Sequence, residues 1–249
     1  MAQNIYDDPA FFAGYSTLPR SIRGLDGAPE WPSLRAMLPS LAGRRVVDLG
    51  CGFGWFCRWA AAQGAAEVLG LDLSERMLER ATADTAGATG HDRISYRRAD
   101  LDTLTTTELP SERFDLAYSS LTVHYLSDLD RFLRTVRASL VPGGTLVVSV
   151  EHPIFSAPSR PGFTTDDRGR VVWPVDDYLD EGPRTTDWFA PGVVKRHRTI
   201  GTYVTGLVRA GFTLTALHEW GPSPEQIAEV PEWSVERDRP PFLLLSATR

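Results

Sequence analysis

The stretch VVDLGCGFG occupies residues 46–54 and decides how the rest of the chain is interpreted. Its apolar first half predicts a short buried strand, and its three glycines predict a tight turn, because glycine adopts positive φ angles at no steric cost. Backbone without side chains also lets a ligand approach closely. The residues beyond the turn predict a helix whose first N–H groups are free. A Gly-x-Gly-x-Gly turn by itself is only a weak indication of nucleotide binding.

Two acidic residues further along strengthen this interpretation. Asp72 ends the next apolar run and lies 22 positions (72 minus 50) after Gly50. An acid there can accept both hydroxyls of an adenosine ribose, because the second parallel strand ends beside the first turn. Asp100 follows a third apolar run and could accept a hydrogen bond from an adenine amino group, with Leu101 against the ring. The sequence therefore predicts an adenosine-containing ligand at one edge of a sheet.

Strand-like and helix-like segments alternate between residues 44 and 150. Apolar side chains recur every three or four positions over residues 129–140, and residues 53–60 carry a second such stripe. This alternation predicts parallel βαβ units covered on both faces, which is a doubly wound α/β sheet. The candidate strands are residues 45–49, 68–71, 94–97, 114–118 and 145–150.

The alternation stops after residue 150. Residues 151–198 are rich in proline and aromatic side chains, which predicts a long, mainly irregular insert that packs against the rest of the molecule. Apolar spacing then predicts a helix over residues 200–208 and two closing strands at 213–220 and 242–248. We therefore divide one domain, residues 1–249, into an N-terminal helical cover (1–43), a ligand-binding core (44–150), the insert (151–198) and closing elements (199–249).

Composition narrows the class of protein. Hydrophobic residues make up 42% of the 249 positions, enough for one well-buried α/β core. A formal net charge of -6 argues against a nucleic-acid partner. Cys51 and Cys57 are the only cysteines and lack the paired spacing of a zinc site, so no metal is expected. Without a secretory signal or a long apolar span, we expect a cytoplasmic protein with no membrane partner.

On these motifs the chain resembles class I S-adenosylmethionine-dependent methyltransferases, a broad group that includes many small-molecule methylating enzymes. The likeness is strong over residues 44–150 and looser over the closing strands. It implies a Rossmann-like, mainly parallel seven-stranded sheet whose last strand is antiparallel. It also implies S-adenosyl-L-methionine as cofactor, with S-adenosyl-L-homocysteine as its product. The family's motifs fall on Asp48, Gly50, Gly52 and Gly54, on Asp72, on Asp100, and on residues 114–120 and 140–144.

The resemblance also implies where the cofactor lies, over the carboxyl ends of the first, second and fourth strands. Ser119 and Leu121 would flank its methionine part. In the family the N-terminal segment often closes over the cofactor, so Tyr15 and Arg20 are candidates for the methionine end, with Arg20 gripping the carboxylate. The alternative is a helix that only packs on the sheet. The candidate cofactor-binding residues are Tyr15, Arg20, Asp48, Gly50, Cys51, Gly52, Asp72, Leu73, Met77, Asp100, Leu101, Ser119 and Leu121.

Methyl transfer from a sulfonium is a direct displacement that needs close alignment and exclusion of water. We expect residues 151–198 to form an aromatic-rich lid that walls the pocket of a small-molecule acceptor, because the insert follows the fifth strand. The alternative is a packing arm or an arm that joins a homodimer.

His124 and His152 are the candidate catalytic residues, because they follow the fourth and fifth strands near the expected donor methyl. A neutral imidazole there could remove a proton from the acceptor. His152 is slightly favoured, since Pro153 fixes the turn after it. Each could instead be a structural hydrogen-bonding residue. The basic cluster at residues 195–198 predicts a solvated junction in preference to a site for an acidic acceptor group.

Two other functions stay open at this point. A dinucleotide-dependent oxidoreductase also uses a strand, a glycine turn and a second-strand acid, but its third glycine would fall at position 55, which is Trp55. A non-catalytic protein that binds the same cofactor is harder to distinguish, because methyl transfer requires no invariant catalytic side chain.

Overall fold

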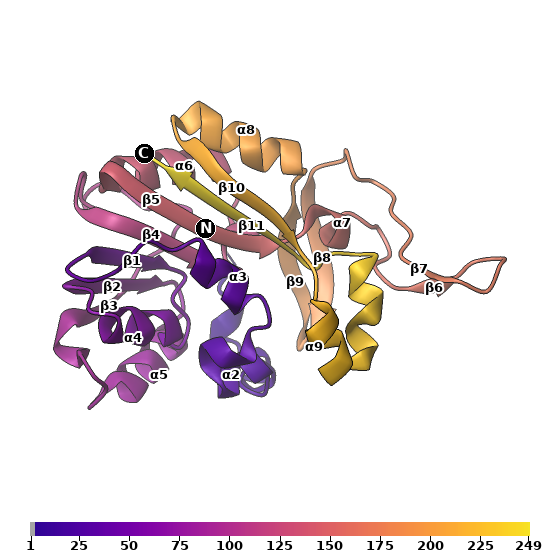
Figure 1. Ribbon diagram of the computed structural model, residues 1–249, viewed down its shortest axis with the longest axis horizontal. Helices are drawn as coiled ribbons and strands as arrows, with labels where there is room; N and C mark the ends of the chain where they lie inside the picture. The colour runs from indigo at the N-terminus through magenta and orange to yellow at the C-terminus, as the bar shows by residue number, and fades with distance from the viewer. Residues whose placement is uncertain (1–2) are drawn as a thin grey trace.

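The computed structural model describes residues 3–249 and has a seven-stranded sheet at its centre (Figure 1). The strands lie in the order β10-β11-β5-β4-β1-β2-β3, and every neighbouring pair is parallel except the two pairs that β11 makes. This confirms the predicted Rossmann-like, doubly wound sheet with one antiparallel strand. The strands are β1 (Arg45–Leu49), β2 (Glu67–Asp72), β3 (Ile94–Arg98), β4 (Phe114–Ser120), β5 (Leu140–Glu151), β10 (Thr213–Trp220) and β11 (Phe242–Thr248).

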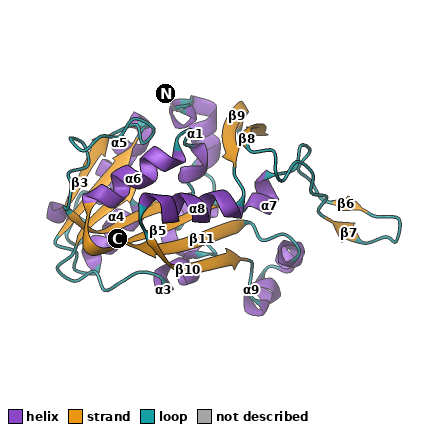
Figure 2. Ribbon diagram, turned by 90° about the horizontal axis from the view of Figure 1, so that it is seen from above, coloured by secondary structure: helices purple, strands orange, loops and turns teal. Residues whose placement is uncertain are grey.

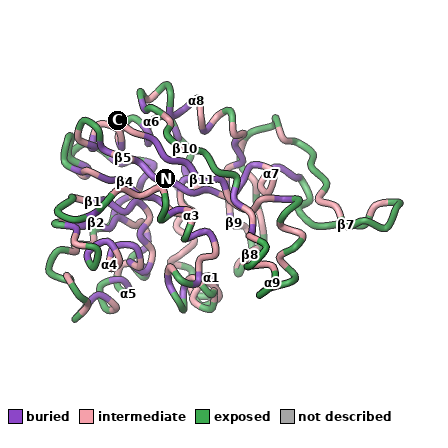
Figure 3. The backbone as a smooth tube through the Cα atoms, in the orientation of Figure 1, coloured by how far each residue is buried: buried purple, intermediate pink, exposed green. Residues whose placement is uncertain are grey.

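Helices cover both faces of the sheet (Figures 1 and 2). One face packs against α6 (Leu129–Ser139) and α8 (Ile200–Ala210), and the other against α3 (Trp31–Ala36) and α4 (Trp55–Ala62), with α5 (Glu75–Thr85) beside β2 and β3. Successive residues of β1 alternate between the two layers: Val46 lies in the α3/α4 layer and Val47 in the α6/α8 layer. The central strands β1 and β4 and the later part of β5 are buried on both faces, which is why they read as nearly continuous apolar runs (Figure 3).

The starts of two elements differ by two residues or more from the sequence-based expectation. The helix α4 begins at Trp55 and leaves Phe53 in the turn, because Gly54 takes a left-handed conformation with φ 71° just before it. The strand β5 begins at Leu140, before the predicted residue 145, because Leu140 pairs with Phe114 ahead of a register shift.

The segment before the sheet is helical. Asp8 starts α1 by accepting hydrogen bonds from the N–H groups of Ala10 and Phe11, both at 2.9 Å, and Pro9 occupies the first turn, where it leaves no backbone bond unmade. The elements of this segment before α3 are the 3-10 helices η1 (Ile5–Asp7) and η2 (Gly24–Gly27) and the α-helices α1 (Pro9–Tyr15) and α2 (Pro19–Ile22).

The insert is more regular than predicted. It contains two hairpins, of which β6–β7 projects away from the sheet in Figures 1 and 2. Within β9 the sequence analysis missed an alternation of burial: Val193, Lys195 and His197 are buried, whereas Gly192, Val194 and Arg196 are only partly buried. The insert's elements are α7 (Pro153–Ser156), β6 (Thr164–Thr165), β7 (Val171–Val172), β8 (Gly182–Trp188) and β9 (Ala190–His197); the remaining helices are η3 (His91–Arg93), η4 (Val123–Tyr125), α9 (Pro224–Glu229) and η5 (Pro231–Arg237).

Candidate active site

A cavity of about 360 Å³ lies at the carboxyl ends of the parallel strands. The turn after β1, the residues that follow β2, β3 and β4, and Glu151 at the end of β5 all line it. This is the switch point of the sheet, where a crevice forms because the chain leaves β1 and β4 toward opposite sides. The predicted residues that line it are Tyr15, Arg20, Asp48, Gly50, Cys51, Gly52, Asp72, Leu73, Met77, Asp100, Leu101, Leu121 and His124.

The glycine turn is held against the acid of the second strand. The N–H of Gly52 donates to Oδ2 of Asp72 at 2.9 Å, and the N–H of Ser74 donates to Oδ1 at 2.9 Å. Each oxygen keeps a further lone pair for a ligand. Burial raises the pKa of Asp72, while these backbone hydrogen bonds lower it. Gly52 has φ 51°, and a Cβ added there would meet nothing within 4 Å, so the turn leaves open space beside the acid.

Asp48 lies beneath the same turn and is 2% exposed. The thiol of Cys57 donates to its Oδ2 at 3.3 Å. Burial raises the pKa of this carboxyl to about 7, and the charge of Asp72 adds to the effect. Asp48 therefore gains or loses a proton near neutral pH, and a cationic ligand in the cavity would favour its ionised form.

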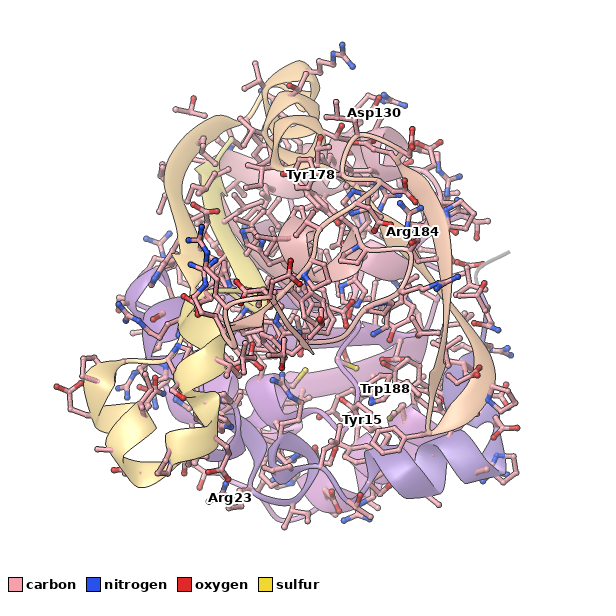
Figure 4. The ribbon with its side chains drawn as sticks, turned by 90° about the vertical axis from the view of Figure 1, so that its right-hand side faces the viewer. Tyr15, Arg23, Asp130, Tyr178, Arg184 and Trp188 are labelled. Carbon is pink, nitrogen blue, oxygen red and sulfur yellow. The ribbon has the colours of Figure 1, made fainter. Side chains whose placement is uncertain are left out.

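The cavity is covered by two segments that we call the roof: residues 3–15 and the hairpin β8–β9. The side-chain amide of Gln3 joins them, because its Nε2 donates to the carbonyl of Gly192 and its Oε1 accepts from the N–H of Val194, both at 2.9 Å. The ring of Trp188 packs edge-on against Tyr15 with centroids 6.4 Å apart (Figure 4). The roof thus brings aromatic side chains from the N-terminal segment and from the insert over the cavity.

A close backbone approach and a carboxylate fix the roof in place. A Cβ at Gly14 would lie 2.5 Å from the ring of Phe189, so only glycine lets α1 pack against the tip of the β8–β9 hairpin. Asp7 accepts a hydrogen bond from Oγ of Ser74 at 2.5 Å and one from the N–H of Arg76 at 3.2 Å. These bonds attach the roof to the start of α5, two residues after Asp72.

His124 is buried and lines the cavity. Its Nδ1 accepts a hydrogen bond from the backbone N–H of Glu151 at 3.3 Å. Burial lowers the pKa of the ring to about 4, so the imidazole is neutral near pH 7 and its proton is on Nε2. With Nδ1 engaged and the proton on Nε2, the ring lacks the free lone pair that the predicted base would need.

Comparison with known proteins identifies the family. Residues 47–148 match a family model described as "Methyltransferase domain". The solved structure of an S-adenosylmethionine-dependent methyltransferase from Mesorhizobium loti is 59% identical, with 91% of this chain and 100% of that chain covered, at a TM-score of 0.84.

This chain belongs to the S-adenosylmethionine-dependent methyltransferases. Family membership decides against the oxidoreductase alternative and establishes S-adenosylmethionine as the cofactor of this methyltransferase. An uncharacterized protein of Haemophilus influenzae is 32% identical over 99% of the chain and 97% of its own length. A ubiquinone biosynthesis O-methyltransferase of a Bradyrhizobium strain is 36% identical over only 45% of the chain and 42% of its own length. The chain thus spans less than half of this curated relative.

Arg20 of the methyltransferase is already paired. Its guanidinium donates to both carboxylate oxygens of Glu30, at 2.9 and 3.2 Å, and Glu30 is fully buried. Two other polar atoms at the cavity wall, Oγ of Ser21 and Nε1 of Trp55, are buried and have no partner among residues 3–249. The free donors beside Arg20 are therefore on Ser21 and Trp55, which the sequence had not indicated.

Contrary to the prediction, two of the candidate site residues do not line the cavity. Ser119 is fully buried in the sheet and its Oγ donates to the carbonyl of Leu49 at 2.7 Å. His152 accepts the N–H of Ile154 on Nδ1 at 3.0 Å, and its Nε2 lies 2.9 Å from Oε1 of Glu219. Because His152 caps α7, which turns away from the cavity, both of its ring nitrogens are engaged elsewhere.

The insert also differs from the predicted lid. Of its side chains only Glu151 and Trp188 line the cavity. Three of its other aromatic rings instead surround the guanidinium of Arg239, with centroids 4.3 to 5.0 Å from it; they belong to Phe155, Phe163 and Trp173. The basic cluster is not a solvated junction, since Lys195, His197 and Arg198 are buried. For the projecting β6–β7 hairpin, the dimer-arm alternative stays a prediction.

Several cavity residues were missed from the sequence. Glu151 could have been found by the rule that selected Asp72 and Asp100, since it too ends a parallel strand. No local pattern indicated that Gln3 joins the two parts of the roof, or that the hydroxyls of Tyr6 and Tyr125 lie 3.2 Å apart. Within the described residues, no group of three or more His, Cys, Asp or Glu side chains is placed to hold a metal, and no helix of residues 3–249 is long and apolar enough to cross a membrane.

We predict that Asp48→Asn changes how stability depends on pH. Between about pH 4 and 7 the folded parent holds a proton on Asp48 that the unfolded chain releases, so this group's contribution to stability falls as pH rises. Relative to the parent, the variant should gain up to about 4 kcal/mol in free energy of unfolding over this range. Chemical denaturation of both proteins at pH 4 to 8 measures it. The free energies of the two proteins are subtracted at each pH, because the lowered pKa of His124 makes stability rise with pH in both proteins and would mask the effect of Asp48. A difference in free energy of unfolding that stays constant from pH 4 to 8 would contradict the prediction.

Proposed function

We propose that this methyltransferase transfers the methyl group of S-adenosylmethionine to a small organic acceptor held inside the roofed cavity. The observation that carries the proposal is the partial cover: the roof lies over the same strand ends that carry the glycine turn and Asp72. A direct displacement gains its rate mainly from alignment and from exclusion of water. A roofed cavity of about 360 Å³ favours both, and it suits a small acceptor.

The residues present fit the cofactor. The carboxylate of Asp72 has spare lone pairs for two ribose hydroxyls, and the open space beside Gly52 admits a ligand close to the backbone. Met77 and Leu101 offer apolar contacts for an adenine ring, with Asp100 beside them. The unpaired donors of Ser21 and Trp55 suit a carboxylate, a role first assigned to Arg20. When bound, the cofactor supplies the electrophilic methyl group.

The other end of the cavity is left for the acceptor. It is lined by His124, Tyr125, Glu151 and Trp188, which follow or face the ends of β4 and β5. In place of the base first expected at this edge, we propose His124 as a hydrogen-bond donor to the acceptor. The net charge of -6 also favours a small molecule over a nucleic acid. Methyltransferases with small acceptors, such as the ubiquinone biosynthesis enzyme, are similar to the core of this chain.

A product screen tests this function. The protein is incubated with methyl-labelled S-adenosylmethionine and either a bacterial small-molecule extract or fractions of tRNA, DNA and protein. We expect label in the low-mass fraction only, and none after the protein is omitted. Label that enters a macromolecular fraction would refute the small-acceptor proposal. A failure to label any fraction would count against the whole assignment of an acceptor site.

A further inference from the structure

The acceptor end of the cavity contains a carboxylate whose two oxygens have different surroundings. Oε1 of Glu151 pairs with Nζ of Lys195 at 2.5 Å, and the two side chains are only 14% and 10% exposed. The ammonium of Lys195 lies over the ring of Trp188, 4.6 Å from its centroid. Oε2 of Glu151 has no hydrogen-bond partner among residues 3–249, and Glu151 lines the cavity. Lys195 thus holds the carboxylate of Glu151 in place through Oε1, while Oε2 is left free to accept a hydrogen bond.

A fixed donor stands beside this acceptor. Nδ1 of His124 accepts the backbone N–H of Glu151 itself, so the ring of His124 and the side chain of Glu151 are tied to the same residue. With Nδ1 used in this way, the ring proton of His124 is on Nε2, which has no partner within the described residues. Both side chains line the cavity, so Nε2–H of His124 and Oε2 of Glu151 are one unpaired donor and one unpaired acceptor tied to the same residue.

The groups that line this end of the cavity disfavour an anionic acceptor. The charge of Lys195 offsets that of Glu151, and neutral His124 adds none. A carboxylate ligand would meet Oε2 of Glu151 with a second set of acceptor oxygens, which is repulsive. A neutral ligand with a donor and an acceptor side by side would satisfy both Glu151 and His124. Buried polar groups discriminate strongly against ligands that leave them unpaired.

We propose that Glu151 and His124 form the acceptor-anchoring subsite of this methyltransferase, and that the acceptor is a neutral, flat molecule carrying an adjacent donor–acceptor pair of the amide type. Oε2 of Glu151 accepts the ligand's N–H or O–H, Nε2–H of His124 donates to its carbonyl oxygen, and the rings of Trp188 and Tyr125 enclose its apolar body. This inference rests on the proposed small-acceptor function and names the chemistry of that acceptor.

Three probe molecules that share a ring test the subsite: benzamide, benzoate and N,N-dimethylbenzamide. Their binding to the full-length protein saturated with S-adenosylhomocysteine is followed by ligand-observed NMR titration, which needs no turnover. Benzamide offers the full donor–acceptor pair, benzoate lacks the donor and is charged, and the dimethyl compound lacks the donor alone. We expect benzamide to bind roughly 10-fold more tightly than either of the others.

The variant Glu151→Gln should narrow the gap between benzamide and benzoate to less than about threefold, because a neutral amide no longer repels a carboxylate. Glu219→Gln is the matched control: Glu219 pairs with His152 outside the cavity, so the ranking should stay that of the parent. Since Glu151→Gln leaves Lys195 buried without its partner, Glu151→Gln combined with Lys195→Met is measured in parallel, with thermal unfolding as the check on folding.

The proposal is overturned if benzoate binds as tightly as benzamide, if none of the three probes binds, or if the folded Glu151 variants keep the parental ranking. Its failure is separable from that of the proposed function. Label found in macromolecules would refute the small acceptor whatever the probes do, whereas label found in a small carboxylic acid would leave the function standing and refute this subsite.

Discussion

Replacing Asp72 with alanine should weaken the binding of S-adenosylhomocysteine by roughly 10²- to 10⁴-fold, since each hydrogen bond to a charged carboxylate contributes about 1.5–3 kcal/mol and two are expected to the ribose. The substitution also frees the N–H groups of Gly52 and Ser74 that the carboxylate accepts in the parent. The glycine turn then loses its support as well as its ligand contact. Isothermal titration calorimetry with S-adenosylhomocysteine measures the affinity directly.

Asp115→Ala is the control for this experiment. Like Asp72, Asp115 accepts a hydrogen bond from a backbone N–H, that of Arg45 at 2.8 Å. It also pairs with the side chain of Arg44 at 3.1 Å, but it does not line the cavity. Its loss should leave the affinity unchanged. The placement of the cofactor would have to be abandoned if Asp72→Ala, still folded by thermal unfolding, bound S-adenosylhomocysteine within threefold of the parent.

Arg239→Ala is expected to produce the largest loss of stability away from the cavity. The guanidinium is buried, pairs with Glu236 and is surrounded by three aromatic rings of the insert. Its removal leaves the carboxylate of Glu236 without its partner and opens a gap between the rings. We expect the free energy of unfolding to fall by about 2–4 kcal/mol. Urea denaturation followed by tryptophan fluorescence measures this, since Trp173 is one of the rings.

The affinity for S-adenosylhomocysteine should be unchanged in Arg239→Ala, because neither Arg239 nor the rings around it line the cavity. The control is Arg170→Ala in the projecting hairpin, whose ion pair with Asp166 lies largely in solvent and should contribute little. A strong loss of affinity in folded Arg239→Ala would contradict this expectation. It would show that the aromatic residues of the insert contribute to the cavity, as the sequence analysis predicted.

Much of the sheet was predictable because its determinants are local. β1 and β11 lie at residues 45–49 and 242–248, as predicted, since continuous apolar runs bounded by polar residues mark strands buried on both faces. The hairpin β8–β9 was missed, because PRTTDW within it contains few apolar residues and its buried positions are partly filled by Lys195 and His197. Those side chains are buried only because partners from other segments satisfy them.

The sequence by itself indicated the alternating strands and helices of the core, the glycine turn and the two strand-end acids Asp72 and Asp100, because the carboxyl ends of parallel strands meet at one edge whatever covers them. Only the tertiary structure decided which histidine faces the cavity and which aromatic residues enclose it. His152 is turned away by α7, and Trp188 meets Tyr15 from 173 positions away (188 minus 15). Such contacts depend on packing between distant segments, and no local periodicity encodes them.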